Sequence, residues 1–235
     1  MAHQMLKMNR LENQTFWFDL VSGKSVSYVQ NIYIWIVFSE LVIVSLIAQF
    51  LFPTPFNFLL HTISDQGSFA MNPTGSLIWR IGVMINGIAH IPHIFFIYQK
   101  TSRINSLWAK ISTLFGLIAA IGFSLVGLIS LDFGASHYVM AVLAFVGYYV
   151  TAILDFIILY DKKSPIKDFM KQSRWIKLFI VYYVISGALC LGSFILSEIF
   201  PFFMSFYPVL EWNYLLAICV WLGIWPRLFY RNKNH

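Results

Sequence analysis

Residues Ile111–Leu131, ISTLFGLIAAIGFSLVGLISL, form a run of 21 residues without a charged side chain. An α-helix needs about 20 mostly apolar residues to cross the roughly 30 Å hydrocarbon core of a bilayer. Five other runs, each 17 to 23 residues long, have the same mostly apolar character. In chain order the six runs are Asn31–Phe52, Ser76–Tyr98, Ile111–Leu131, Tyr138–Tyr160, Leu178–Phe200 and Tyr214–Tyr230. They predict an all-α, polytopic integral membrane protein with six transmembrane helices and short loops.

The composition of the chain excludes an ordinary soluble domain. Of its 235 residues, 59% are apolar and only 11% are charged, whereas about a quarter of the residues in soluble domains are charged. Because the connections are short, we expect residues 31–230 to form one transmembrane domain, preceded by segment 1–30 and followed by tail 231–235. The first 30 residues lack the apolar core and cleavage site of a signal peptide, so the first helix is expected to be an uncleaved anchor.

Fifteen of the sixteen lysines and arginines fall on one side of this six-helix pattern. They lie in the N-terminal segment, in the second and fourth connections and at the C-terminal end. The three intervening connections, Pro53–Gly75, Asp132–His137 and Pro201–Asn213, contain none. Short basic loops stay in the cytoplasm by the positive-inside rule, so both termini are expected to be cytoplasmic. The same bias accounts for the net charge of +6 without a nucleic-acid partner.

Several polar side chains fall inside the predicted membrane spans. Asn86, His90 and His93 share one face of the second helix. The first helix carries Glu40 near its middle, and the fourth carries Asp155 toward its cytoplasmic end. Ionisable groups at such depth cost about 2.5–3.5 kcal/mol each to insert, so they are expected to face the bundle interior and to find partners there. Glu40 and His90 are the expected pair, which could relay protons, bind an ion or simply hold helices together.

A second group of polar side chains is expected at the outer face of the membrane. Its members are His61, Ser64, Asp65, Asp132, His137, Glu198 and Glu211. Arg80, about one turn into the second helix, is the only strong cation on this side. We therefore expect Arg80 to pair with Asp65 or Asp132. The guanidinium would either fix the first outer loop over the bundle or act as a fork-shaped donor to a lipid phosphate or a carboxylate.

Four of these outer side chains, His61, Asp65, Asp132 and His137, are of types that bind divalent metals. The signal is weak, because no HExxH motif occurs. We expect no cofactor, with a divalent metal at these four residues as the alternative. Ser64 is a poor nucleophile candidate, because the sequence assures no base beside it.

The first outer loop is long for such a compact bundle, and loops of this kind are more often functional than idle. It contains the stretch His61–Gly67, HTISDQG, and then Asn72-Pro73. Arg80 and Asn86 follow in the next helix. This pattern resembles the ISD-x-G … P signature of a superfamily of six-helix membrane proteins. That superfamily includes the damage-regulated autophagy modulators and a prokaryotic family of unknown function, and the GPI-anchor remodelling proteins that act after protein attachment look like more distant relatives. Asp132–Phe145 is similar to the second polar motif of the superfamily.

The resemblance has implications for the site and for the membrane. It implies a common outward-facing feature made of Ser64, Asp65, Gly67, Asn86 and His137. It also implies contact with lipids in or at the membrane. The residues on either side of Pro73 depart from the autophagy branch and favour the prokaryotic branch, so we expect a prokaryotic plasma membrane.

Three functions fit these observations. The first is a non-enzymatic protein that accepts a lipid headgroup in an outward-facing polar pocket under the first outer loop, with Arg80 and a histidine meeting phosphate. Its expected ligand-binding residues are His61, Ser64, Asp65, Arg80, Asn86, His90, Asp132 and His137. The second is a membrane-embedded lipid hydrolase or acyl-transfer enzyme, with or without a metal, and its catalytic residues would be His61, Asp65, Asp132 and His137. The third is a proton- or ion-coupled transporter using Glu40, His90, His93 and Asp155, against which the absence of an internal repeat argues. Whether the protein is an enzyme stays open, with the balance against it, and so does its oligomeric state.

Overall fold

The computed structural model describes residues 15–197, 200, 202 and 205–231. The N-terminal residues 1–14, with Lys7 and Arg10, residues 198–199, with Glu198 of the predicted outer polar group, and the tail residues 232–235, with Lys233, lie outside the described residues. The described part contains six long helices: α2 Ser27–Phe50, α3 Ser76–Thr101, α4 Ser106–Leu128, α5 Ala135–Leu159, α7 Arg174–Ser197 and α8 Tyr207–Arg231. All six are long and apolar enough to cross a membrane, which confirms the predicted all-α class and the six helices.

Five of the six helices begin three to seven residues earlier than the apolar runs predicted, and only α3 begins at the predicted Ser76. Among the five, α2 begins at Ser27, α4 at Ser106 and α8 at Tyr207. The apolar runs mark the hydrocarbon core, whereas helical hydrogen bonding continues into the more polar residues of the membrane interface. At the start of α4 the Asn105 side chain accepts a hydrogen bond from the Trp108 amide at 3.3 Å, and such a cap satisfies an otherwise unpaired donor.

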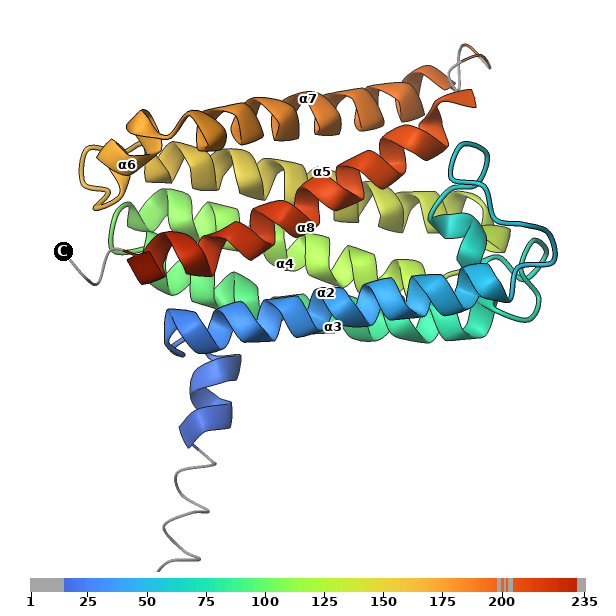
Figure 1. The fold of residues 1–235 in the computed structure, drawn as a ribbon, viewed down its shortest axis with the longest axis horizontal. Coiled ribbons are helices and arrows are strands. Elements are labelled where there is room, and N and C mark those ends of the chain that lie inside the picture. Colours follow the sequence, from blue (N-terminus) through green and yellow to red (C-terminus); the bar gives the residue numbers. More distant parts are fainter. Residues whose placement is uncertain (1–14, 198–199, 201, 203–204, 232–235) are drawn as a thin grey trace, which may run out of the picture.

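The six helices form a ring in which neighbours in sequence are neighbours in space (Figure 1). α4 packs against α3 and α5, α7 packs against α5 and α8, and contacts between α2 and α8 close the ring. The interior is filled by large aromatic side chains, among them Tyr148, Tyr183, Tyr214 and Trp221, which are at most 2% exposed.

The two ends of the bundle differ in chemistry. At one end, here called the loop end, lie residues 51–75 with the short 3₁₀ helix η1 Ser64–Gly67, and residues 129–134 with η2 Leu131–Phe133 (Figure 1). At the opposite end, here called the basic end, lie residues 15–26, the C-terminal part of α8 and the short helix α6 Lys167–Gln172. Apart from Arg80, the lysines and arginines of the described residues belong to the basic end or to the adjoining helix turns.

Small residues allow α3 and α4 to approach closely. A Cβ atom added to Gly127 in α4 would lie 2.4 Å from the Arg80 carbonyl oxygen, and one added to Gly87 in α3 would lie 2.4 Å from the Ser124 amide nitrogen. Neither position has room for a side chain. Gly87 and Gly127 therefore serve the close packing of α3 on α4, as small residues commonly do between helices in membranes.

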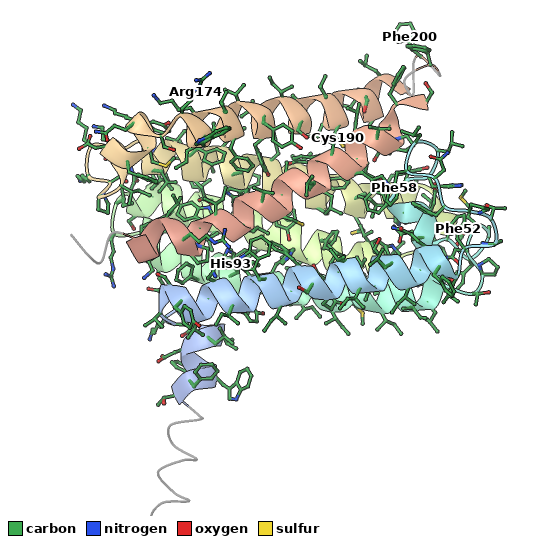
Figure 2. All side chains as sticks on the ribbon, in the orientation of Figure 1. Phe52, Phe58, His93, Arg174, Cys190 and Phe200 are labelled. Carbon is green, nitrogen blue, oxygen red and sulfur yellow. The ribbon has the colours of Figure 1, made fainter. Side chains whose placement is uncertain are left out.

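The outward surface of the bundle is apolar along its length. Leu46 of α2, Ile85 of α3 and Leu189 of α7 are more than half exposed, and Figure 2 shows such side chains projecting from the ribbon on all visible sides. Soluble proteins rarely expose a contiguous apolar surface of this extent. Lipid chains provide the solvent that such a surface requires.

Candidate functional site

The loop that precedes α3 is organised by a reciprocal pair of hydrogen bonds. The Asp65 carboxylate accepts from the Thr62 amide at 2.7 Å, and the Thr62 hydroxyl accepts from the Asp65 amide at 3.1 Å. This is the capping-box arrangement, in which a side chain three residues into a helix and the cap residue satisfy one another. The aspartate of the ISD motif, the second residue of η1, thus fixes the start of this short helix to Thr62. Burial raises the pKa of Asp65 above its usual range, although the Thr62 hydrogen bonds and nearby His61 act in the opposite direction.

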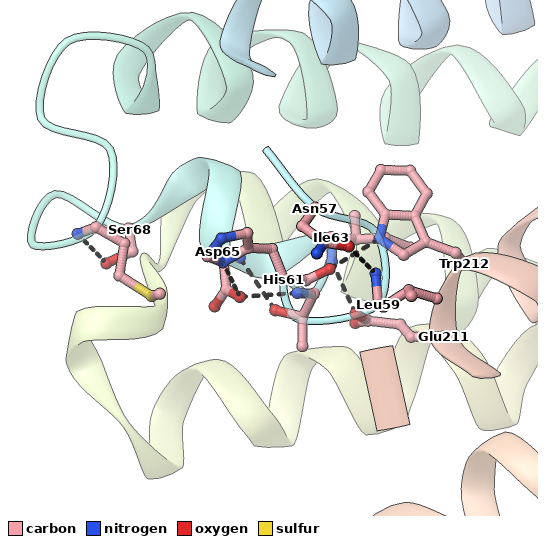
Figure 3. A network of polar contacts seen from close by, with 10 residues as sticks. Asn57, Leu59, His61, Ile63, Asp65, Ser68, Glu211 and Trp212 are labelled. Atoms are coloured by element: carbon pink, nitrogen blue, oxygen red, sulfur yellow. Dashed lines mark hydrogen bonds and ion pairs between the residues drawn. The ribbon is translucent and has the colours of Figure 1, made fainter. Parts of the chain in front are cut away.

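Two side chains of α8 fix the same loop from the other side. The Glu211 carboxylate accepts from the Ile63 amide at 2.8 Å, and the Trp212 indole donates to the His61 carbonyl at 3.0 Å. Figure 3 shows both side chains reaching from the helix to the loop. Glu211 is only 2% exposed. It belongs to the predicted outer polar group but not to the predicted ligand-binding residues, so it adds a carboxylate to the site.

These contacts surround a pocket of about 220 Å³ enclosed by the loop, α5, α7 and α8. Five polar or ionisable side chains in its wall come from three separate segments: Thr62, Ser64, Asp65, His137 and Glu211. The hydroxyl-bearing rings of Tyr138 and Tyr207 also line it, together with apolar groups such as Phe194. No lysine or arginine is among the lining residues. We call this cavity the polar pocket.

Ser64 and His137 are hydrogen-bonded to each other in the wall of the polar pocket. His137 Nε2 lies 2.9 Å from the Ser64 hydroxyl, and His137 Nδ1 lies 2.6 Å from the Ile129 carbonyl oxygen. Both side chains are buried, at 8% and 2% exposure. The base that the sequence could not assure beside Ser64 is thus present.

Of the eight predicted ligand-binding residues, three line the polar pocket, namely Ser64, Asp65 and His137. His61 lies behind the wall: its ring packs against Phe52 and Phe56, with Nδ1 3.8 Å from the Asp65 carboxylate. The other four are placed elsewhere. The predicted ligand-binding residues did not include Thr62, Tyr207 or Glu211, which also line the pocket. Of these three, Glu211 was expected in the outer polar group.

Asp132 binds the loop rather than the pocket. It accepts from the Ser68 hydroxyl at 2.7 Å, from the amides of Phe69 and Ala70 at 2.7 and 3.3 Å, and from the Ser130 hydroxyl. Burial alone would raise the pKa of Asp132, but these four hydrogen bonds outweigh it and hold that pKa well below its usual range. Asp132 is therefore an ionised anchor for residues 68–70.

The predicted pairing of Arg80 with Asp65 or Asp132 is wrong. Arg80 donates from Nε to the Gly127 carbonyl at 3.0 Å and from Nη2 to the Leu128 carbonyl, while its guanidinium lies 4.6 Å from the centre of the Phe69 ring. The last carbonyls of a helix lack intrahelical partners, and a cation there also complements the negative end of the helix dipole. Arg80 therefore caps α4, and it does not line the polar pocket.

The four candidate metal ligands do not assemble. Asp132 is occupied by residues 68–70, and the His61 ring packs against Phe52 and Phe56. Within the described part of the chain, no group of three or more histidine, cysteine, aspartate or glutamate side chains is arranged to hold a metal ion. The residues present thus do not fit the divalent metal considered from the sequence.

The predicted Glu40–His90 pair is also wrong. Glu40 accepts from the Asn86 side chain at 2.7 Å, and the same amide donates to the Val37 carbonyl at 2.7 Å. His90 instead hydrogen-bonds to Tyr148 and stacks on Phe123, with their ring centroids 6.0 Å apart. Asn86 and His90 therefore tie α3 to α2 and α5, away from the polar pocket.

The remaining intramembrane residues make separate contacts of their own. His93 lies 3.1 Å from the Gln30 side-chain amide and 3.0 Å from the Leu222 carbonyl, and Figure 2 shows it pointing into the bundle. Asp155 accepts from the Ser112 hydroxyl at 2.6 Å. Among the described residues, no hydrogen bond joins these groups to Glu40 or to His90. These polar groups therefore form separate contacts between pairs of helices. They do not form the continuous polar path through the bundle that the transporter hypothesis requires.

A larger, apolar groove of about 430 Å³ lies between α2 and α8 toward the loop end. Its wall includes Trp35, Phe38, Leu46, Phe58, Trp212 and Leu216. Its volume falls within the roughly 300–1,000 Å³ of small-molecule sites. The few polar groups in the wall are used internally, since Gln49 donates to Ser45 and Ser45 donates to Gln66. We call this cavity the apolar groove.

One family model matches the chain. It is described as the Frag1/DRAM/Sfk1/Cwh43P N-terminal domain, and it covers residues 25–227, which include all six long helices apart from the last few residues of α8. No curated protein and no solved structure matches the chain.

Proposed function

The chain belongs to the Frag1/DRAM/Sfk1/Cwh43P N-terminal domain family, and from that premise we propose that it binds a membrane lipid at its loop end. In this proposal the headgroup region enters the polar pocket, and an acyl chain of the same or a neighbouring lipid occupies the apolar groove. The observation that carries the proposal is a built polar cavity, walled by buried carboxylates, at the end of a bundle whose surface is apolar.

The lining of the polar pocket indicates which headgroup chemistry it would accept. Asp65 and Glu211 are acceptors when ionised, and Ser64 and Thr62 carry hydroxyls. Without lysine or arginine in the wall, the pocket is poorly suited to phosphate as its principal partner. It suits hydroxyl or ammonium groups, which donate hydrogen bonds. The expectation that Arg80 meets a lipid phosphate gives way to this proposal, because Arg80 is committed to the end of α4.

The apolar groove supports the second half of the proposal. It opens between two helices that are candidate membrane spans, so an occupant enters from the hydrocarbon region. Its aliphatic and aromatic wall offers dispersion contacts but few hydrogen bonds, which suits a hydrocarbon chain. Phe58 of the loop and Trp212 of α8, with ring centroids 5.1 Å apart, contribute to its wall. Trp212 is adjacent in sequence to Glu211, so one turn of α8 contributes to both cavities.

We also propose that the loop end faces away from the cytoplasm and that the basic end lies in it. The cations gathered at the basic end support this orientation through the positive-inside rule. The motif resemblance favours a prokaryotic plasma membrane. Membrane lipids would then be the partners of the protein, and they would reach the polar pocket from the outer leaflet.

Lipid retention by the purified protein tests the proposal. Native mass spectrometry of the full chain released from mild detergent should show bound lipid, and Glu211→Gln and Asp65→Asn should each retain at least about tenfold less, since hydrogen bonds to charged groups contribute about 1.5–3 kcal/mol. Both variants keep an oxygen that can accept from the Ile63 or Thr62 amide. Asp161→Asn changes a partly exposed aspartate at the basic end. It is the matched control and should retain lipid as the wild type does. A wild-type protein without lipid, or equal retention in all four proteins, would exclude the proposal.

A further inference from the structure

The contact between Ser64 and His137 has a chemical consequence beyond binding. The Ile129 carbonyl can only accept a hydrogen bond, and it lies 2.6 Å from His137 Nδ1. Nδ1 must therefore carry the proton of the neutral imidazole. Nε2, 2.9 Å from the Ser64 hydroxyl, is left with its lone pair and accepts the serine proton. This is the tautomer that a general base for serine requires.

Both partners are held in place by rigid surroundings. His137 lies in the first turn of α5, and Ser64 is the first residue of η1. η1 is fixed by the Thr62–Asp65 capping box and by the bond from the Ile63 amide to Glu211. Ser68, the residue after η1, donates from its hydroxyl to the Asp132 carboxylate at 2.7 Å, which ties η1 to the chain segment that follows Ile129. A nucleophile and its base need such fixed geometry to react rather than merely to touch.

The position of the pair determines which substrates could reach it. Ser64 and His137 both line the polar pocket, so a molecule that fills this cavity contacts both. The ester linkages of a lipid lie at the boundary between its headgroup and its acyl chains. A lipid with its headgroup beside Asp65 and Glu211 would therefore place these linkages beside Ser64 and His137. Serine activated by histidine is the arrangement that attacks acyl carbonyls.

From this geometry we propose that Ser64 is the nucleophile, and His137 its general base, of an acyl-transfer reaction on an ester-linked lipid held in the polar pocket. The inference takes its substrate from the proposed lipid binding. In the first half, the Ser64 oxygen bonds to the ester carbonyl carbon and its proton passes to His137 Nε2. The carbon–oxygen bond to the lipid alcohol then breaks, and that oxygen takes the proton from His137. The acyl group is left on Ser64.

In the second half, water or the hydroxyl of a second lipid attacks the acyl-serine. Its proton passes to His137 Nε2, the bond between the acyl carbon and the Ser64 oxygen breaks, and Ser64 regains the proton. The products are a lipid alcohol and either a fatty acid or a new ester. No electrons are exchanged with any other group. The Ile129 carbonyl holds the imidazole orientation throughout, as a positioning group.

A fluorophosphonate probe tests this assignment, because it forms a stable adduct only with an activated serine. The full chain in nanodiscs of phosphatidylethanolamine and phosphatidylglycerol would be incubated with the probe, and the labelled residue located by peptide mass spectrometry. We expect an adduct at Ser64. His137→Gln should lower the labelling rate at least about 100-fold, since general bases contribute about 10²–10⁴-fold, and Ser64→Ala should abolish it. Ser205→Ala, an exposed serine whose hydroxyl donates to the Phe202 carbonyl, is the matched control and should label as the wild type does.

Two further measurements keep the outcome decisive. If His137→Gln does not fold, His137→Ala replaces it, and added imidazole should restore labelling. Native mass spectrometry on the same samples reports lipid retention separately. Bound lipid without an adduct at Ser64 would overturn the catalytic assignment and leave the binding proposal standing. An adduct at Ser64 without bound lipid would overturn the binding proposal and leave Ser64 as an activated serine. If His137→Gln labels as fast as the wild type, His137 is not the general base.

Discussion

Asp132→Asn is the substitution whose effect follows most directly from the loop geometry. The carboxylate accepts four hydrogen bonds, from the Ser68 and Ser130 hydroxyls and from the amides of Phe69 and Ala70. A hydrogen bond to a charged group contributes about 1.5–3 kcal/mol when it is well shielded. An asparagine keeps one oxygen and turns an NH₂ group toward the remaining donors, so at least two of the four bonds are lost.

The expected cost is smaller than the sum of two such bonds, because Asp132 is partly exposed and water replaces part of what is lost. We estimate about 2 kcal/mol, which corresponds to roughly 30-fold more frequent opening of residues 68–70. Hydrogen–deuterium exchange of the detergent-solubilised protein measures this directly on peptides covering the Phe69 and Ala70 amides. Peptides from α6, at the other end of the bundle, should exchange at the wild-type rate.

Asp161→Asn supplies the matched control for this experiment. Asp161 also lies in a loop and accepts from a backbone amide, that of Lys163 at 2.9 Å, but at the basic end. That variant should leave residues 68–70 untouched. Unchanged exchange at residues 68–70 in Asp132→Asn would refute the assignment of Asp132 as the anchor of this loop.

Three further outcomes follow from the packing and from the loop. Gly127→Ala should lower the free energy of unfolding by about 1–3 kcal/mol, because its Cβ would lie 2.4 Å from the Arg80 carbonyl oxygen. Thermal unfolding in detergent should show a lower Tm for this variant but not for Gly192→Ala, whose new Cβ has nothing within 4 Å. Equal Tm values for the two variants would count against the close α3–α4 contact. Arg80→Met should also lower the Tm, by removing the cap on α4, while leaving lipid retention in native mass spectrometry unchanged; loss of the lipid would instead return Arg80 to the binding site. Finally, the folded-state pKa of Asp132 is depressed, so its contribution to stability is present above the unfolded value of about 3.9 and is lost as the pH falls below about 4. The opening of residues 68–70, obtained from exchange corrected for the pH dependence of the intrinsic amide rate, should therefore increase more between pH 6 and 3 in the wild type than in Asp132→Asn, and an equal increase in both would contradict this.

The sequence carried enough information to predict the helices but not their contacts. Apolar runs of about 20 residues indicate membrane-spanning helices, and all six predicted runs correspond to candidate spans. Helical periodicity also predicted correctly that Asn86, His90 and His93 face the interior. Periodicity gives the angular position of a residue but not its depth relative to the next helix. Glu40 and His90 were therefore paired wrongly, because α2 and α3 bring Asn86 to Glu40 instead.

The errors in the polar group at the loop end have a similar cause. The prediction paired Arg80 with a carboxylate, because the attraction between opposite charges acts over a longer range than a hydrogen bond to a carbonyl. The end of α4 offers two carbonyls without intrahelical partners at hydrogen-bonding distance, and sequence alone does not show which helix end lies beside which side chain. The Ser64–His137 contact joins residues 73 positions apart. It depends on how η1 docks on α5, which no local pattern encodes.

The proposed lipid occupies the loop end with its headgroup region among Asp65, His137 and Glu211. Photo-crosslinking tests this placement with a phospholipid that carries a diazirine close to its ester linkage. Adducts should concentrate on residues 57–66 and on the first turns of α8, and Glu211→Gln should diminish them. Adducts spread evenly over outward-facing residues such as Ile43 and Leu189, with no excess at the loop end, would contradict it.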